Sequence, residues 1–371
     1  MNDQIAPKPY HRRKLAVRLV LTVLGLAYFL AWCYLAKRGV PALAHHINLR
    51  WLVLIIFAVI LFGLLELLTL PLSIYAGYLL EHRFGLSNQT PRDYLTTTLK
   101  QWAVGGILGL ILLIGLYALL WYGGRLWWLW TWCAWVVLLV LLTRLLPTVV
   151  LPIFYKTSPL KDEALRNRLI RLAAGSALQL TDVQSFDLSK ETKKANAALV
   201  GLGRSRRVLL ADTLLDRFDH DQIAVVFAHE LAHHRRGHIP KLLLLSALTS
   251  TVSLAVVLYP LARYAGPAPA DWPAAAAALP QVCLAAGLVG LLLQPLLNAF
   301  ARRFEIQADL DALTLTHDPH AFSTAMHKLA QTNLADPQPH PFVEWYFYDH
   351  PALARRIALA DRFTEHAESP A

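Results

Sequence analysis

The residues best suited to chemistry in this sequence are two histidines and a glutamate in close succession. His229, Glu230 and His233 form the pattern His-Glu-x-x-His. In a helix, residues i and i+4 lie on one face, so both imidazoles can bind one ion while the glutamate reaches water beside it. Imidazole ligands suit zinc, and a catalytic zinc has three protein ligands and one open position. The pattern therefore predicts one zinc ion in a hydrolytic site, with Glu230 as the general base.

A third metal ligand is expected farther along the chain. Glu305 and Asp309 are also four residues apart, so a ligand and a carboxylate that accepts the outer N–H of a ligating histidine share one helix face. Seventy-two positions separate His233 from Glu305, but two apolar segments fill the interval. An antiparallel membrane hairpin there would return both ends to the same side and bring Glu305 to the two histidines.

Three further residues could assist this group. His238 follows the motif closely and is expected either to support the metal site or to serve only the structure. A tetrahedral oxyanion needs a donor in addition to the metal, and His350 and Arg356 are candidate donors. Their spacing alone does not assign either of them that role.

The elements that must position these residues are dominated by apolar segments. The 371 residues are 56% hydrophobic and 16% charged, and the mean hydropathy is +0.41. An average soluble domain has about 25% charged residues, so the composition argues against an ordinary soluble enzyme and against a disordered chain. About 20 apolar residues cross the hydrocarbon core of a bilayer. Segments with this character are 15–36, 51–70, 102–121, 126–143, 242–261 and 274–297, which predicts a multi-pass integral membrane protein.

The placement of Lys and Arg predicts the orientation of these spans. With a cytosolic N-terminus, six spans return the C-terminus and the zinc site to the cytosol, and the outward loops hold only five of the 35 basic residues. Cytosolic loops carry the excess of positive charge in membrane proteins. The net charge of +10 is thus a topology signal, and the expected surroundings are a lipid bilayer rather than nucleic acid.

The polar remainder divides the chain into four parts. Residues 1–150 hold four spans, 151–239 form a polar segment that ends in the motif helix, 240–300 form a hairpin of two spans, and 301–371 are again polar. Within the second part, 162–177 has helical spacing, whereas 183–188, 195–200 and 208–211 have the character of short strands. We therefore expect a mainly α membrane fold joined to a cytosolic α+β region.

Other blocks of the chain follow a definite order around the motif. They are 71–75, 80–90, Asn196 with Ala197 and Gly201, 206–215, Gly237 with His238, Asn298 with Arg302 and Arg303, Glu305 with Ala308 and Asp309, and His350 with Pro351, Arg356 and Ile357. In this order, and over nearly the whole length, the blocks resemble the integral-membrane zinc metalloproteases of the CaaX prenyl protease type 1 family.

The resemblance implies a fold, a cofactor and a set of roles. Members of that family enclose a large water-filled chamber within the membrane, with one zinc ion at its cytosolic end, and cut near the C-terminus of prenylated CaaX proteins. An edge strand that carries Asn196 would pair with extended substrate. The expected site residues are the zinc ligands His229, His233 and Glu305, the base Glu230, the supporting residues Asp309 and His238, the oxyanion or substrate contacts His350 and Arg356, and the substrate contacts Asn196 and Asn298.

The sequence also departs from the family pattern. We count six spans where the eukaryotic members have seven, which could reshape the chamber. Ala232 and His234 stand where Gly and Trp are common, and Asp349 replaces a small hydroxyl residue. None of these changes removes a metal ligand. The compact length suggests a prokaryotic source and a bacterial inner membrane, where prenylated CaaX proteins are not expected as normal substrates.

These observations predict a membrane-embedded zinc endopeptidase that acts from the cytosolic side on peptides or proteins that are membrane-associated, membrane-embedded or prenylated. One alternative is a quality-control protease that degrades misfolded membrane proteins. Another is a non-catalytic membrane chaperone or binder that holds zinc for structure. The intact Glu230 argues against the last alternative, because a structural zinc site needs no base.

Overall fold

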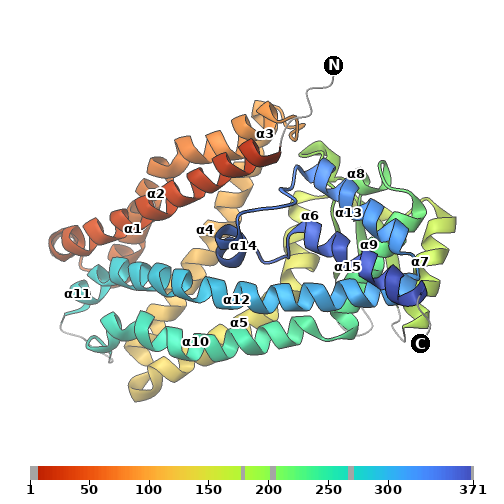
Figure 1. The fold of residues 1–371 in the computed structure, drawn as a ribbon. Coiled ribbons are helices and arrows are strands. Elements are labelled where there is room, and N and C mark those ends of the chain that lie inside the picture. The colour runs from red at the N-terminus through yellow and green to blue at the C-terminus, as the bar shows by residue number, and fades with distance from the viewer. Residues whose placement is uncertain (1–6, 177–179, 201–205, 266–270, 369–371) are drawn as a thin grey trace.

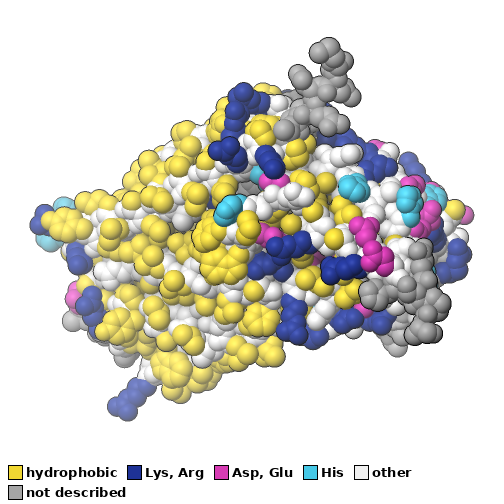
Figure 2. All heavy atoms as spheres, in the orientation of Figure 1, with side chains coloured by type: hydrophobic (Ala, Val, Ile, Leu, Met, Phe, Trp, Pro, Cys, Tyr) yellow, Lys and Arg dark blue, Asp and Glu magenta, His cyan; other side chains and the backbone are white. Residues whose placement is uncertain are grey.

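Apolar and polar segments of the chain occupy opposite ends of the molecule. The computed structural model describes residues 7–176, 180–200, 206–265 and 271–368. Long helices form one end, and a smaller part with both helices and strands forms the other (Figure 1). Figure 2 shows hydrophobic side chains over the visible face of the long helices, whereas charged side chains gather over the smaller part and at the far helix ends. This distribution fits a bilayer around the long helices.

Among the described residues, six helical segments are long and apolar enough to cross a membrane, which confirms the predicted number of spans. Each segment contains one of the apolar stretches seen in the sequence. They are α1 (Pro7–His46); α2 (Arg50–Ile74) with the π-helical η1 (Tyr75–Leu79) and α3 (Leu80–Arg83); α4 (Pro91–Tyr122); η2 (Gly124–Leu126), α5 (Trp127–Leu145), the π-helical η3 (Leu146–Val150) and α6 (Leu151–Phe154); α10 (His238–Ala262); and α11 (Trp272–Ala277) with α12 (Leu279–Thr316).

The two longest of these helices extend far beyond the thickness of a bilayer. With a rise of 1.5 Å per residue, the 40 residues of α1 and the 38 residues of α12 extend for about 60 and about 57 Å, against a hydrocarbon core of about 30 Å. α12 therefore continues from the membrane into the polar part. The boundary that we expected at residue 300 falls inside this helix, so α12 joins the two regions as one element.

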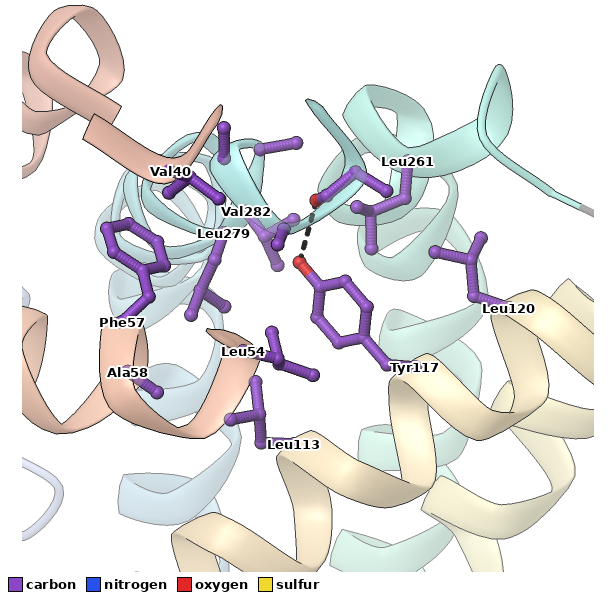
Figure 3. Close-up of a cluster of buried hydrophobic side chains, with 14 of the residues drawn as sticks. Val40, Leu54, Phe57, Ala58, Leu113, Tyr117, Leu120, Leu261, Leu279 and Val282 are labelled. Carbon is purple, nitrogen blue, oxygen red and sulfur yellow. Dashed lines mark hydrogen bonds between the residues drawn. The ribbon is translucent and has the colours of Figure 1, made fainter. Parts of the chain in front are cut away.

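A cluster of buried apolar side chains holds the helices together at the end far from the sheet (Figure 3). Its members come from α1, α2, α4, α5, α10, α11 and α12 and include Leu54, Tyr117 and Leu261. The Tyr117 hydroxyl donates a hydrogen bond to the backbone carbonyl of Ala275 at 2.9 Å. This bond satisfies a hydroxyl that would otherwise be buried without a partner. The cluster thereby ties α4 to the start of the last span and fixes the hairpin of α10 and α12.

The polar part is built on a four-stranded sheet with the order β1-β2-β4-β3. β2 (Asp182–Phe186) pairs in parallel with β4 (Arg207–Ala211), while β1 (Thr157–Pro159) and β3 (Ala197–Val200) form antiparallel edges. The sequence predicted β2, β3 and β4 to within two residues at each end. It did not predict β1, because three exposed residues ending in proline carry no alternating pattern.

α9 (His220–Arg235) lies at the centre of the polar part, packed against the sheet, α12 and α13. A capping box of Asp219 and Gln222 begins it. Gly237 has a φ of 63°, a left-handed conformation that glycine adopts without steric cost, so α10 starts directly after α9. The other elements of this part are α7 (Glu163–Gly175), which the sequence predicted, η4 (Leu188–Lys190), α8 (Asp212–Leu215), α13 (Pro319–Asn333), α14 (Pro341–Phe347) and α15 (Leu353–Glu368).

Candidate metal centre

Three side chains from two helices meet where the polar part joins the long helices. His229 and His233 lie one turn apart on α9, and Glu305 lies on α12. The Nε2 atoms of the two histidines are 3.1 Å apart, and each lies 3.2 Å from a carboxylate oxygen of Glu305. One ligand atom from each residue lies within 4.8 Å of the others. The hairpin of α10 and α12 thus brings together three residues that are far apart in the sequence.

The chemistry of this group fits a zinc ion. Two imidazoles and one carboxylate form a ligand set that catalytic zinc uses, with the fourth position open. Glu305 Oε2 is buried, with the Nε2 atoms of His229 and His350 at 3.2 and 3.4 Å, but within the described part of the chain it accepts no hydrogen bond, so a cation would satisfy it. Burial lowers the pKa of His229, but the carboxylates of Asp309 and Glu305 outweigh this effect and raise the pKa to about 9. The surroundings therefore favour positive charge where the three side chains converge.

Asp309 holds His229 through a hydrogen bond to Nδ1, the ring nitrogen that faces away from Glu305. Asp309 lies one turn after Glu305 on α12, and its Oδ1 accepts a hydrogen bond from His229 Nδ1 at 2.8 Å. A bond of this kind fixes the tautomer whose Nε2 is free to bind a metal. Arg356 on α15 donates to both oxygens of Asp309, from Nε to Oδ2 at 2.8 Å and from Nη2 to Oδ1 at 2.6 Å. All three residues are buried.

The position of Arg356 differs from our expectation that it contacts the substrate or the oxyanion. Its guanidinium is buried against Asp309, on the Nδ1 side of His229. The open side of the metal ligands lies at Nε2 instead. Spacing in the sequence could not reveal this contact, because Arg356 and Asp309 are 47 residues apart and lie on different helices.

A second chain of hydrogen bonds holds His233. Its Nδ1 lies 2.9 Å from Nδ1 of His238, whose Nε2 lies 3.1 Å from Gln307 Oε1. When Nε2 of His233 binds a metal, its Nδ1 carries the proton, so His238 accepts at Nδ1 and donates from Nε2 to Gln307. The ring of Phe304 stacks on His238 with the centroids 4.5 Å apart. Sequence reasoning missed Gln307, because a residue two positions from Glu305 lies on a different face of the helix.

Glu230 lies between the candidate metal ligands and the edge strand β3. Burial raises the pKa of the Glu230 carboxyl above its ordinary value, although positive charge on the neighbouring histidines and a hydrogen bond from the Leu199 backbone oppose the rise. Leu199 belongs to β3, and its carbonyl oxygen lies 2.8 Å from His234 Nε2. Glu230 and His234, one turn apart on α9, therefore hold the backbone of Leu199 beside the candidate metal ligands.

His350 approaches the metal ligands from the segment between α14 and α15. Its Nε2 lies 3.4 Å from Glu305 Oε2, and its Nδ1 lies 2.9 Å from Asp349 Oδ1. The hydrogen bond to Asp349 raises the pKa of His350 and so favours the imidazolium form. The side chain is 55% exposed, so it faces solvent as well as Glu305. This position suits a donor to negative charge that develops beside the ligands.

α12 also holds the segment that carries His350. Arg302 Nη1 donates to the backbone carbonyls of Glu344 and Tyr348, and Asn298 Nδ2 donates to the carbonyl of Tyr346 at 2.6 Å. We expected Asn298 to contact substrate, but its amide is bound to α14, two turns before Glu305. The contacts of Arg302 and Asn298 fix the position of the aromatic helix α14 and of the chain that follows it.

Asn196 precedes the edge strand rather than lying within it. β3 begins at Ala197, and the backbone carbonyl of Asn196 accepts a hydrogen bond from the N–H of Ala211 at 3.0 Å. The residue itself is exposed. The edge that we expected to face a substrate therefore starts one residue after Asn196.

Comparison with known proteins gives matches over both parts of the chain. Residues 159–364 match the family model for peptidase family M48, and residues 7–156 match the model for the CAAX prenyl protease N-terminal region, described as five membrane helices. The stretch that matches the second model contains four of the six candidate spans found here. The spans of this chain are therefore distributed differently from those the model describes.

Individual relatives agree with these models. The chain is 26% identical over 318 residues to an uncharacterised metalloprotease, YhfN, of Bacillus subtilis, covering 84% of this chain and 74% of that protein. It is 28% identical over 339 residues to CAAX prenyl protease 1 of Saccharomyces cerevisiae, covering 83% and 72%. Its fold matches the crystal structure of S. mikatae Ste24p with a TM-score of 0.80 and 23% identity, over 97% of this chain and 90% of that one.

Proposed function

This chain belongs to peptidase family M48, and from that premise we propose the reaction that its metal centre performs. It is a membrane metalloprotease of the CAAX prenyl protease 1 type. We propose that it is a zinc endopeptidase of a bacterial inner membrane. It cleaves membrane-associated or lipidated peptides on the cytosolic side, the side on which its N- and C-termini lie.

The convergence of His229, His233 and Glu305 carries this proposal. A zinc ion held there would polarise the scissile carbonyl and acidify a water molecule. Glu230 takes the proton from that water and later delivers it to the leaving amine. Burial raises the pKa of the Glu230 carboxyl toward neutral pH. A group with such a pKa both accepts and donates a proton efficiently.

The neighbouring groups hold the substrate and the developing charge. The imidazolium of His350 donates a hydrogen bond to the oxyanion, which needs a donor in addition to the metal. An extended peptide pairs with the backbone groups of β3 other than those of Leu199, which Glu230 and His234 already hold, as peptides do at strand edges in other proteins. Asp309 and His238 hold the two histidine ligands in one tautomer each, and Arg356 acts through Asp309 as a positioning residue.

The general base is tested with Glu230→Gln, which keeps the size of the side chain and removes its basicity. Peptide cleavage by the purified protein in detergent should fall by about 10²–10⁴-fold, while one zinc per chain is retained by elemental analysis. His233→Ala is the matched control and should lose both zinc and activity. A Glu230→Gln protein that cleaves as fast as the wild type would show that another group is the base.

The substrate class needs a panel of substrates. We expect cleavage of a farnesylated CaaX peptide, and a slower reaction with the same peptide without the lipid. Cleavage of misfolded membrane-protein fragments, but never of the farnesylated peptide, would instead establish a quality-control protease. Stoichiometric zinc without cleavage of any substrate would establish a non-catalytic binder.

A further inference from the structure

A large cavity lies between the first helix and the segment that carries His350. Its volume is about 850 Å³, and it is lined by the start of α1, by Ala76 and by residues 336–348. Lys8, Arg12, Leu15, Arg18 and Thr22 all line it. They recur every three or four residues, so one face of α1 forms a wall of the cavity. The metal ligands are not part of its lining.

The cavity is cationic at one end and apolar at the other. Lys8, His11, Arg12 and Lys14 line the end where α1 begins, and Asp336 is the only acidic residue among the described lining residues. In Figure 2, Lys and Arg side chains gather where α1 begins, above α14 in this view. The other end is formed mostly by apolar side chains, with Arg18 and Thr22 among them; the apolar members are Leu15, Val17 and Leu21 of α1 and Val343 and Phe347 of α14.

Two of these cations have no partner among the described residues. Lys14 is bound to Glu81 and to the carbonyl of Ala76, and Arg18 lies over the ring of Phe347, 5.0 Å from its centroid. Lys8 and Arg12 are exposed and make neither a hydrogen bond nor an ion pair within the described part of the chain. Their charge is therefore available to a ligand.

The cavity lies at the boundary between the membrane and water. α1 changes from polar to apolar at this level, since its apolar segment starts near Leu15. α14, on the opposite wall, exposes Phe342 and Trp345 to 56% and 50%. Exposed aromatic rings of this kind gather at the level of the lipid head groups. From the cationic end to the apolar end, the cavity therefore follows the order of a phospholipid, with the head group first and the acyl chain second.

We propose that this cavity binds one anionic phospholipid of the bilayer, with its phosphate at Lys8 and Arg12 and an acyl chain along the apolar face of α1 and α14. The site stands apart from the peptidase activity, since it uses none of the metal-site residues. The lipid bridges α1 and α14, and α14 is in turn fixed to α12 through Asn298 and Arg302.

The test measures lipid binding to the full chain in neutral detergent by native mass spectrometry, in the Glu230→Gln background so that catalysis plays no part. Phosphatidylglycerol should be retained at least tenfold more tightly than phosphatidylcholine. Lys8→Ala combined with Arg12→Ala should weaken phosphatidylglycerol binding by about 25-fold, from about fivefold for each basic residue near an anionic lipid. Both residues are exposed, so the double variant should fold, which its unfolding temperature without lipid checks.

A matched control removes two cations from the other end of the same helix. Lys37→Ala with Arg38→Ala changes the net charge equally but should leave phosphatidylglycerol binding unchanged. Equal loss in both double variants, or equal retention of the two phospholipids by the wild type, would overturn the proposal. Glycerophosphoglycerol, the head group without chains, should bind at least tenfold more weakly. Binding of it or of inorganic phosphate as tight as that of the lipid would show a site for free anions instead.

Discussion

Replacing Asp309 by Asn should separate the two roles of this carboxylate, which are the ion pair with Arg356 and the hydrogen bond to His229. Asp309 has no exposed surface and joins His229 to Arg356. Asparagine keeps the shape but puts an NH₂ group where one oxygen accepts from the guanidinium. The buried Arg356 then loses half of its partner, and breaking a buried ion pair in this way costs about 3–5 kcal/mol. The ratio of folded to unfolded protein should fall by a factor of about 10²–10⁴.

Zinc binding should weaken in the same variant. An asparagine oxygen is a weaker acceptor for His229 Nδ1–H than a carboxylate, and changes to such partners typically cost 10–100-fold in metal affinity. Competition with a chelator on the purified protein in detergent measures the affinity, and thermal unfolding at fixed zinc concentration measures stability. Asp311→Asn is a matched control, because Asp311 pairs with Arg236 rather than with a metal ligand. It should leave zinc affinity unchanged.

The double variant Asp309→Asn with Arg356→Met separates the effect on stability from the effect on zinc affinity. With both charges gone, most of the stability should return, whereas zinc affinity should stay low because His229 still lacks its carboxylate. Arg356→Met alone distinguishes positioning from substrate contact. Unchanged zinc affinity together with a raised KM in this variant would refute the positioning role, since that combination indicates a lost substrate interaction.

Three other changes have defined outcomes. His238→Phe removes the acceptor for His233 Nδ1–H while keeping a ring against Phe304, so zinc affinity should fall about 10–100-fold by chelator competition. The hydrogen bond to Asp349 raises the pKa of His350, so Asp349→Asn should lower that pKa. The variant then loses the imidazolium at a lower pH than the wild type. The alkaline limb of the pH profile of kcat/KM should therefore move to lower pH, while the acidic limb stays. Tyr117→Phe removes one of two donors to the Ala275 carbonyl, which keeps the backbone N–H of Ala278, and should cost about 0.5–1.5 kcal/mol in thermal unfolding, with zinc affinity unchanged.

Features set by local periodicity or by composition were predictable from the sequence. The six spans follow from stretches of about 20 residues that are too apolar for a soluble helix. The two histidines share a helix face whatever the rest of the fold does. Glu305 could be connected to them because a hairpin of two spans must return to its starting side. Each of these inferences needs only a short window of sequence or a count of membrane crossings.

Contacts that depend on tertiary packing were not predictable. Arg356 reaches Asp309 from a different helix, and nothing in its own segment distinguishes this contact from one with substrate. Asn298 lies two helical turns before Glu305, a spacing that suits a substrate contact, yet its amide donates a hydrogen bond to the carbonyl of Tyr346. β1 exists only because β2 offers it an edge to pair with. Such pairings depend on where distant elements meet, which periodicity does not encode.

Because α12 continues as one helix from the apolar segment to Glu305, its length gives the distance of the candidate metal site from the membrane. Its apolar segment ends at Leu297, and Glu305 follows eight residues later on the same helix. At 1.5 Å per residue, the metal ligand lies about 12 Å beyond the apolar segment. An extended peptide covers about 3.3 Å per residue, so a substrate anchored at the bilayer surface reaches the ligands with about four residues of free chain. For the membrane-anchored substrates proposed above, the length of α12 would therefore help to select the cleaved bond by its distance from the anchor.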